Sequence, residues 1–407
     1  MTMTIAENPA PLSGIRVLEL GQIAAGPFAA SLFGDLGADV VKIERPDGGD
    51  GMRQWPPLRD PSNTRDGDAY SENFASVNRN KRSVALDLKN KDDIKTLKAL
   101  VAKADILVEN YRPGVLPRLG LGYEDLKLVN PKLVYCSISG YGQTGPYARK
   151  GAFDVTVQAI AGMMSVTGEA GAPPVKCGVP IGDFCAGLYA GFSILAMLRG
   201  VEASGVGAHI DCSMLGSLLG VAALQTSEYF GTDQAPQRLG SAHPRNAPYQ
   251  AFEASDTYFV IAAGNDKLWH EVCVAVNLPE MAQDTRFLTQ SDRAQNQQDL
   301  VAILAPIFKS RSAADWLDEM DNRNVPCAPI NDFAQILADP HVHHMELVKP
   351  LNLPNGTTTN TVAFPMSITG VDTGKVQPPP SLGAHNAEVI DEWLKGENIT
   401  SKRRDNE

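Results

Sequence analysis

The sequence predicts an α/β protein with one large domain on a parallel sheet and a second, smaller α+β domain. Strand-like apolar runs alternate with helix-like segments through residues 1–220, which is the pattern of a parallel sheet covered on both faces. Near Gly220 the alternation stops and a hairpin pattern replaces it. The chain has 407 residues, 43% of them hydrophobic, which is enough for more than one domain with a sizeable core.

The elements of the large domain follow from apolar periodicity. We expect strands, in chain order, at 15–20, 39–44, 84–88, 106–109 and 133–138. We expect helices at 26–37, 91–103, near 114, near 124 and at 186–199. The long polar stretch 45–76 is expected to be a functional or mobile loop. Ligands in such folds bind at the carboxyl ends of the strands.

The smaller domain begins with a predicted β-hairpin. Residues 249–254 and 257–263 are strand-like and flank Ser-Asp, and a helix is expected from about Lys267. Further on, proline-rich turns lead to a last helix near 388–395 and a charged tail. We therefore predict domains at 1–220 and 221–335, followed by a C-terminal segment at 336–407.

The composition argues against several functional classes. The chain has 36 Lys and Arg against 47 Asp and Glu, a net charge of −11, which disfavours nucleic-acid and anionic-membrane partners. Six cysteines without a CxxC pair indicate a reduced protein. The histidines at 341–344 lack companions at zinc-ligand spacing, so we expect no metal. Without a targeting signal or an apolar run of about 18 residues, we expect a soluble cytoplasmic protein.

One segment is basic in spite of the acidic total. Residues 40–120 contain 15 Lys and Arg against 12 Asp and Glu, with the densest cluster at 78–83. Four more basic residues belong to this segment: Lys42, Arg45, Arg112 and Arg118. Such a set would suit a ligand with several phosphates, although solvated surface charges produce the same pattern. No Walker loop or GxGxxG motif follows the first strand, which disfavours ordinary nucleotide folds.

Two carboxylates stand at predicted helix starts. Asp183 comes directly before an apolar helix, and Asp154 precedes another apolar run. An aspartate at such a place can cap the helix, or it can act as a nucleophile in covalent catalysis. The residues alone leave both interpretations open for both positions. The small residues at 263–266, at the end of a predicted strand, are interpreted as an ordinary hairpin turn rather than as an active-site lid.

Motifs spread over most of the chain resemble CoA-transferase family III. They occur at 12–20, 25–29, 36–46, 78–83, 108–114 and 140–146. Residues 242–252 and 325–331 are similar to the branch that moves CoA between dicarboxylates, which includes the succinate–hydroxymethylglutarate CoA-transferases. The resemblance implies a large Rossmann-like domain joined to the small domain as a ring. It also implies that two rings interlock as a homodimer and that the C-terminal segment returns to the large domain.

The resemblance further implies the roles of individual residues. Asp183 matches the family's catalytic aspartate, which forms an acyl anhydride and then an aspartyl-CoA thioester. Seven positions match residues that contact CoA: Ala25, Arg45, Asn78, Lys81, Asn110, Tyr111 and Arg118. Lys150 lies beside a position that is basic in some members and is expected to be an eighth contact. Asp154 matches a position where some relatives carry a glutamate close to the nucleophile, and we expect it to serve the acid substrate. A dicarboxylate also needs a cation for its remote carboxylate. Arg238, His243 and Arg245 lie near the dicarboxylate-branch motif and are the candidates, although exposed loop charges produce the same pattern. Coenzyme A and acyl-CoA would be substrates, and no permanently bound cofactor is expected.

Two departures and one rival bear on the reaction. Ala24 stands where formyl-CoA transferases have a glutamine, and residues 262–265 are poorer in glycine than their tetraglycine loop. Both features favour another acid pair, and we expect succinyl-CoA or a similar dicarboxyl-CoA as donor. The rival is a 2-methylacyl-CoA racemase, which needs an aspartate and a histidine as proton carriers. Phe153 occupies the position of that histidine, which favours the transferase.

Overall fold

The structure is a computed structural model that describes residues 10–59 and 69–395. Its contacts divide the chain into two compact units. Of the described residues, the first unit comprises 10–59, 69–161, 177–227 and 341–395, and the second comprises 162–176 and 228–340. The division differs from the expected boundaries at 220 and 335, mainly because 162–176 joins the second unit. Within the second unit, the Gly240 amide donates to the Gly168 carbonyl at 3.0 Å. This hydrogen bond joins segments that are 72 residues apart, so the pattern along the sequence could not predict it.

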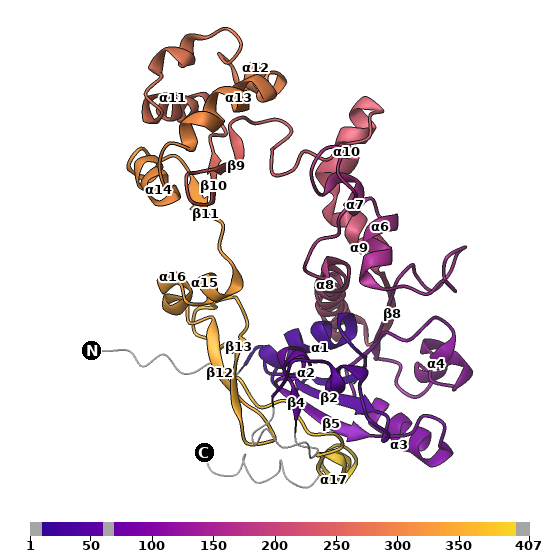
Figure 1. Ribbon diagram of the computed structural model, residues 1–407. Coiled ribbons are helices and arrows are strands. Elements are labelled where there is room, and N and C mark those ends of the chain that lie inside the picture. The colour runs from indigo at the N-terminus through magenta and orange to yellow at the C-terminus, as the bar shows by residue number, and fades with distance from the viewer. Residues whose placement is uncertain (1–9, 60–68, 396–407) are drawn as a thin grey trace. The chain divides into compact units, whose positions relative to one another are not determined.

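A six-stranded parallel sheet forms the centre of the first unit (Figure 1). Its strands, in spatial order, are β5 (Lys81–Ala85), β2 (Asp39–Glu44), β1 (Arg16–Leu20), β6 (Ile106–Glu109), β7 (Val134–Ser139) and β8 (Ala208–Ser213). All five strand pairs are parallel, which confirms the predicted α/β fold with a parallel sheet. β5 begins at Lys81 rather than at the expected residue 84, because the basic cluster itself pairs with β2.

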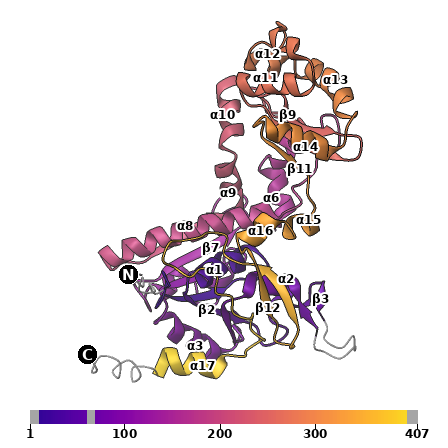
Figure 2. The ribbon, with the colours of Figure 1, turned by 90° about the vertical axis from the view of Figure 1, so that its left-hand side faces the viewer.

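Helices cover both faces of this sheet. Figure 2 shows α8 (Ile181–Ser204) and α1 (Ala25–Asp35) on one face and α3 (Lys91–Val101) and α17 (Asn386–Ile390) on the other. The short helices α4 (Val115–Arg118) and α5 (Tyr123–Leu126) pack on the same face as α3. On that face, apolar side chains of β1, β2, β6 and β7 form one buried cluster with α3, α17 and Trp393.

The C-terminal segment contacts the edge strand β5. The His385 amide donates to the Ser83 carbonyl at 3.0 Å, and Arg82 pairs with Glu388 at 2.9 Å. The π-helical turn η3 (Asp391–Lys395) ends the described chain, and its Trp393 is buried. The hairpin of β12 (Val348–Asn352) and β13 (Thr358–Val362) precedes this segment.

The stretch 45–76 is more ordered than expected. Its described part contains η1 (Gly51–Gln54), β3 (Leu58–Arg59), β4 (Tyr70–Ser71) and the start of α2 (Glu72–Asn78), while 60–68 lie outside the described residues. Asp50 caps η1, Ser71 caps α2, and the Arg53 guanidinium lies 3.9 Å above the Phe74 ring. These local contacts give order to a polar sequence that lacks apolar periodicity.

Helix α8 is long and apolar enough to cross a membrane by length and composition alone. This is weak support for a membrane span, because core helices of soluble proteins pass the same test. It packs along α1, β7 and β8. Its opposite face exposes Leu188, Phe192 and Leu195, which share one side of a helix because they are spaced by four and three residues.

The second unit has its own sheet and core. Its antiparallel strands are ordered β11 (Cys327–Pro329), β10 (Tyr258–Ala262) and β9 (Tyr249–Glu253), which confirms the predicted hairpin. Trp269, Phe308 and Trp316 are central to its core. Its other elements are α7 (Met163–Val166), α11 (Asp266–Ala275), η2 (Pro279–Gln283), α12 (Gln290–Gln295), α13 (Gln297–Phe308), α14 (Ala313–Asn322) and α15 (Phe333–Leu337). The remaining helices are α6 (Asp154–Ile160), α9 (Met214–Val221), α10 (Ala223–Thr232) and α16 (Pro340–His344).

Candidate active site

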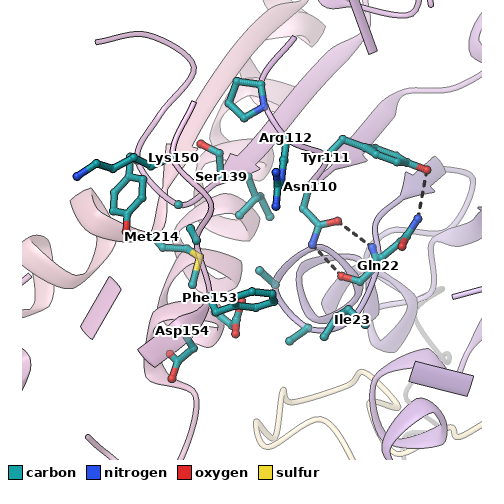
Figure 3. Close-up of a pocket in the computed structure, with 18 of the residues that line it drawn as sticks. Gln22, Ile23, Asn110, Tyr111, Arg112, Ser139, Lys150, Phe153, Asp154 and Met214 are labelled. Carbon is teal, nitrogen blue, oxygen red and sulfur yellow. Dashed lines mark hydrogen bonds between the residues drawn. The ribbon is translucent and has the colours of Figure 1, made fainter. Parts of the chain in front are cut away.

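A cavity of about 390 Å³ lies in the first unit where four parallel strands end (Figure 3). Gln22 follows β1, Asn110 follows β6, Gly140 follows β7 and Met214 follows β8, and all four line the cavity. The volume falls within the range of small-molecule sites. The remaining wall comes from residues 148–154 and from the first turn of α8.

Two carboxylates, Asp154 and Asp183, line this cavity, but their surroundings differ. Asp154 uses one oxygen to accept from the Gly182 amide at 2.8 Å and the other to accept from Gln158 Nε2 at 2.7 Å. Gln158 is itself held, because its Oε1 accepts from the Cys177 amide at 2.9 Å. Asp154 therefore caps the first turn of α8 from a neighbouring helix. No hydrogen bond to the Asp183 carboxylate comes from the described residues.

Asp183 does not cap its helix, contrary to one of the two sequence interpretations. α8 begins at Ile181 with Pro180 at the N-cap, so Asp183 is the third helical residue. Burial raises the pKa of Asp183 to about 6, and the negative charge of Asp154 adds to the increase. The structure thus contains one carboxylate whose oxygens both accept hydrogen bonds and one that is partly buried and accepts none from the described residues.

The wall opposite is the turn between β1 and α1. The Asn110 side chain accepts from the Gln22 amide and donates to the Gln22 carbonyl, both at 2.8 Å (Figure 3). Tyr111 accepts from Gln22 Nε2 at 3.4 Å. Ala24 and Ala25 complete this wall at the start of α1, which has no side-chain cap. Three of the predicted CoA contacts, Ala25, Asn110 and Tyr111, therefore lie together on this wall of the cavity.

Two basic residues line the cavity. Lys150 is a predicted CoA contact, and its ammonium lies 3.9 Å from the centre of the Tyr147 ring. The Arg112 guanidinium lies beside Gly151, because a Cβ built on this glycine would be 3.6 Å from Arg112 Nη2. Two cations and two carboxylates therefore line the same cavity.

The other predicted CoA contacts are not lining residues of this cavity. Lys81 is buried, and its ammonium binds Glu19 at 2.6 Å, the Pro27 carbonyl at 2.8 Å and Asn78 Oδ1 at 3.0 Å. Burial lowers the pKa of Lys81 to about 8. Arg45 is exposed and donates to the Gly49 carbonyl at 2.9 Å, and Arg118 is exposed at the end of α4.

The three residues predicted to hold a remote carboxylate lie in the second unit. Arg238 donates to the Ala172 carbonyl at 2.8 Å. Arg245 pairs with Glu228 at 3.2 Å, and its amide donates to His243 Nδ1 at 3.1 Å.

Several lining residues were not predicted as site residues. Gln22 and Ile23 adjoin the quoted motif that begins at Ala25, and Tyr141 lies inside the motif 140–146, so motif context could have found them. Met214 carries no sequence signal, because only the pairing of β8 beside β7 brings it to the cavity. Within 10–59 and 69–395, no group of three or more His, Cys, Asp or Glu could hold a metal ion.

Comparison with known proteins identifies the family. The family profile described as CoA-transferase family III matches residues 12–386. The chain belongs to CoA-transferase family III. A relative from Mus musculus, succinyl-CoA:glutarate CoA-transferase, is 38% identical over 95% of this chain and 87% of its own length. The acetyl-CoA:oxalate CoA-transferase of Acetobacter aceti is 40% identical over 82% of this chain and 85% of its own length.

A solved structure agrees with the family III assignment. The crystal structure of a CAIB/BAIF family protein from Brucella suis has a TM-score of 0.84 and 36% identity, and covers 95% of this chain and 100% of that chain. The parallel sheet and its helices therefore belong to the family fold, and the chain is a family III CoA-transferase.

Proposed function

We propose that this enzyme transfers coenzyme A from succinyl-CoA, or a similar C4–C6 dicarboxyl-CoA, to a carboxylic acid through covalent intermediates on Asp183. The observation that carries the proposal is the contrast between the two carboxylates of the cavity. Asp154 has both oxygens engaged, whereas Asp183 accepts no hydrogen bond from the described residues and has a raised pKa. A nucleophile needs a free lone pair and weak solvation.

The reaction balances without another reactant. An Asp183 oxygen attacks the donor thioester carbonyl, the C–S bond breaks, and an acyl-aspartyl anhydride and CoA thiolate result. The thiolate attacks the aspartyl carbonyl, which releases the donor acid as carboxylate and leaves aspartyl-CoA thioester. The acceptor carboxylate then attacks this thioester and releases CoA thiolate. Finally the thiolate attacks the acceptor's acyl carbon in the new anhydride, which yields acyl-CoA and restores the Asp183 carboxylate.

We propose that CoA is held by the eight residues expected from the resemblance. Ala25, Asn110, Tyr111 and Lys150 line the cavity beside Asp183, which supports their part in this set. Arg45 and Arg118 are exposed cations suited to phosphates. Asn78 and Lys81 bind each other and buried groups, so a contact with CoA requires them to exchange partners.

Trapping the intermediate tests the covalent mechanism. Incubation with donor acyl-CoA and hydroxylamine should convert aspartyl-CoA thioester into an aspartyl hydroxamate and free CoA thiol. Peptide mass spectrometry should locate the hydroxamate at Asp183. A hydroxamate at Asp154, or none at either residue during active transfer, would overturn the assignment.

The substrate class is tested with a panel of thioesters and acids. The mouse and Acetobacter relatives are named for the dicarboxylates glutarate and oxalate, and Arg112 and Lys150 place two cations in the cavity. Arg238, His243 and Arg245 are proposed to hold the remote carboxylate. We expect kcat/KM for C4–C6 dicarboxylic acids to exceed that for chain-matched monocarboxylic acids by about 10-fold or more. Transfer between monocarboxylates alone would contradict this class, and so would a preference for oxalate, which has only two carbons.

The same panel distinguishes the racemase alternative. A racemase would exchange the α-proton of a 2-methylacyl-CoA with solvent deuterium and would transfer no CoA. Phe153, which is 77% exposed and lines the cavity, cannot carry a proton. We expect transfer without α-proton exchange.

We also propose an interlocked homodimer of ring-shaped subunits in the cytoplasm, as the resemblance implies. The exposed apolar face of α8 supports an interface, and Phe192 on it is 74% exposed. Phe192→Glu is expected to shift the protein from dimer to monomer in light scattering, whereas Lys95→Glu, at an exposed position of α3 on the other face of the sheet, should leave the dimer intact. A wild-type monomer, or binding of wild type to lipid vesicles through this face, would overturn the dimer proposal.

A further inference from the structure

The turn that forms one wall of the cavity contains a strained residue. Ile23 has φ +65°, a left-handed conformation that is unfavourable for a β-branched side chain. Its neighbours allow little adjustment, because a Cβ added to Gly21 would lie 3.0 Å from Pro27 Cδ, and one on Gly26 would lie 3.2 Å from Asn110 Cγ. Such a conformation persists only where surrounding contacts impose it.

Asp50 makes the contact at the strained residue itself. Its carboxylate accepts from the Ile23 amide with both oxygens, each at 3.1 Å, and from the Met52 amide at 3.0 Å. Asp50 is 1% exposed, and its own amide donates to Glu44 Oε2 at 3.0 Å. The carboxylate is therefore fixed from several sides and acts as a rigid acceptor.

Buried charges hold the rest of the turn in the same manner. The Lys42 ammonium pairs with Asp50 at 3.0 Å and with Glu19 at 2.6 Å, and it donates to the Gly21 carbonyl at 2.8 Å. Lys81, also paired with Glu19, donates to the Pro27 carbonyl at 2.8 Å. A network of alternating charges thus runs beneath the turn and binds its backbone at both ends and at its middle.

This network sets the position of the cavity wall. Ile23, Ala24 and Ala25 line the same cavity as Asp183. If Ile23 relaxed to negative φ, the peptide planes on both sides of it would rotate and the Ala24–Ala25 wall would shift. Displacements of about 1 Å in a site can lower turnover by about 100-fold.

We propose that Asp50 is a positioning residue for CoA transfer, which holds Ile23 in its left-handed conformation and thereby keeps the cavity wall in place opposite Asp183. This inference rests on the proposed function, because it assigns the wall a part in the reaction at Asp183. It adds a residue that touches no substrate and acts through the backbone of the turn.

A double-mutant cycle between positions 50 and 23 tests the inference. Asp50→Ala is expected to lower kcat by about 10- to 100-fold with a smaller change in KM. Asp50→Asn keeps one acceptor oxygen, so its kcat should fall much less than that of Asp50→Ala. Glycine adopts positive φ without steric cost. The loss of kcat caused by the change at Asp50 should therefore be at least about threefold smaller in the Ile23→Gly background.

Thermal unfolding supplies a second readout that needs no activity. The loss in Tm caused by Asp50→Asn should be at least about 2 °C smaller when position 23 is glycine. Asp35→Asn is the matched control. Like Asp50, Asp35 is a buried carboxylate with a cationic partner, in this case Arg79 at 2.5 Å, but it does not contact the turn at Ile23. Its effects on Tm and kcat should be the same with Ile or Gly at position 23.

The outcomes separate the two proposals. Equal losses from the Asp50 changes in both backgrounds, in kcat and in Tm, would overturn the positioning role. If Asp50→Ala does not fold, Asp50→Asn in the two backgrounds decides in the same way. Coupling in Tm without any aspartyl-CoA adduct in the wild type would instead overturn the proposed function and leave the contact between Asp50 and Ile23 established.

Discussion

Replacing Asp183 by Asn is expected to lower the rate of CoA transfer by at least about 1,000-fold. The amide is similar in size to the carboxylate but cannot attack a thioester, so the cavity keeps its shape while the covalent route is lost. The measurement is kcat for CoA transfer, with the products separated by chromatography. Asp183→Ala should lower kcat by a similar factor. It is a useful second variant because an asparagine can deamidate to aspartate and restore activity, whereas an alanine cannot.

Asp154→Asn is the matched control for this experiment. It removes the other carboxylate of the cavity, yet an asparagine oxygen can still accept from the Gly182 amide, which now donates to Asp154 at 2.8 Å. We expect a loss of about 10-fold and a hydroxamate that still forms at Asp183. A larger loss from Asp154→Asn than from Asp183→Asn would reverse the roles of the two aspartates.

The Asp183→Asn variant is also expected to be more stable than the wild type at neutral pH. Burial, followed by the charge of Asp154, raises the pKa of Asp183 from 3.8 to about 6. Because the folded pKa lies above the unfolded one, the ionised carboxylate destabilises the fold, and this cost is fully present above about pH 6 and disappears below about pH 4. A rise of this size corresponds to about 3 kcal/mol, and partial solvent exposure reduces the expected gain to about 1–3 kcal/mol.

Unfolding of wild type and Asp183→Asn at pH 7.5 and pH 4.5 measures this effect. The stability difference should be largest at the higher pH and should shrink at the lower one, where wild-type Asp183 is protonated in the fold. The kcat/KM of the wild type should rise with pH through an apparent pKa of about 6, because the ionised form is the nucleophile. A variant less stable than wild type at pH 7.5 would show that Asp183 has a structural role instead.

The strand and helix pattern was largely predictable, because it depends on local periodicity. β1, β2, β6 and β7 follow the expected apolar runs closely. β8 was not predicted, although His209 and Asp211 alternate with apolar residues, which is the pattern of a half-buried strand. β5 starts within the basic cluster because Lys81 pairs with Glu19 inside the fold, a contact that a reading of local charge cannot anticipate.

The site was predictable only in part for a related reason. The motifs placed Asp183 and Asp154 at helix starts, and both lie in first turns. Which carboxylate caps a helix and which stays free depends on contacts between α6 and α8, since Asp154 accepts from the amide of Gly182. Asp50 carried no sequence signal beyond a polar stretch, because its role depends on the backbone of Ile23, 27 positions away.

The amino-acid sequence by itself determined the alternating architecture, the hairpin of the second unit and, through its motifs, the resemblance to family III. These features depend on residue type and on spacing along the chain. Only the tertiary structure decided that Asp154 is engaged while Asp183 is free, and that a buried charge network holds the turn at Ile23. The physical reason is that hydrogen-bond satisfaction and burial are properties of neighbours in space, and folding brings these neighbours together from distant parts of the chain.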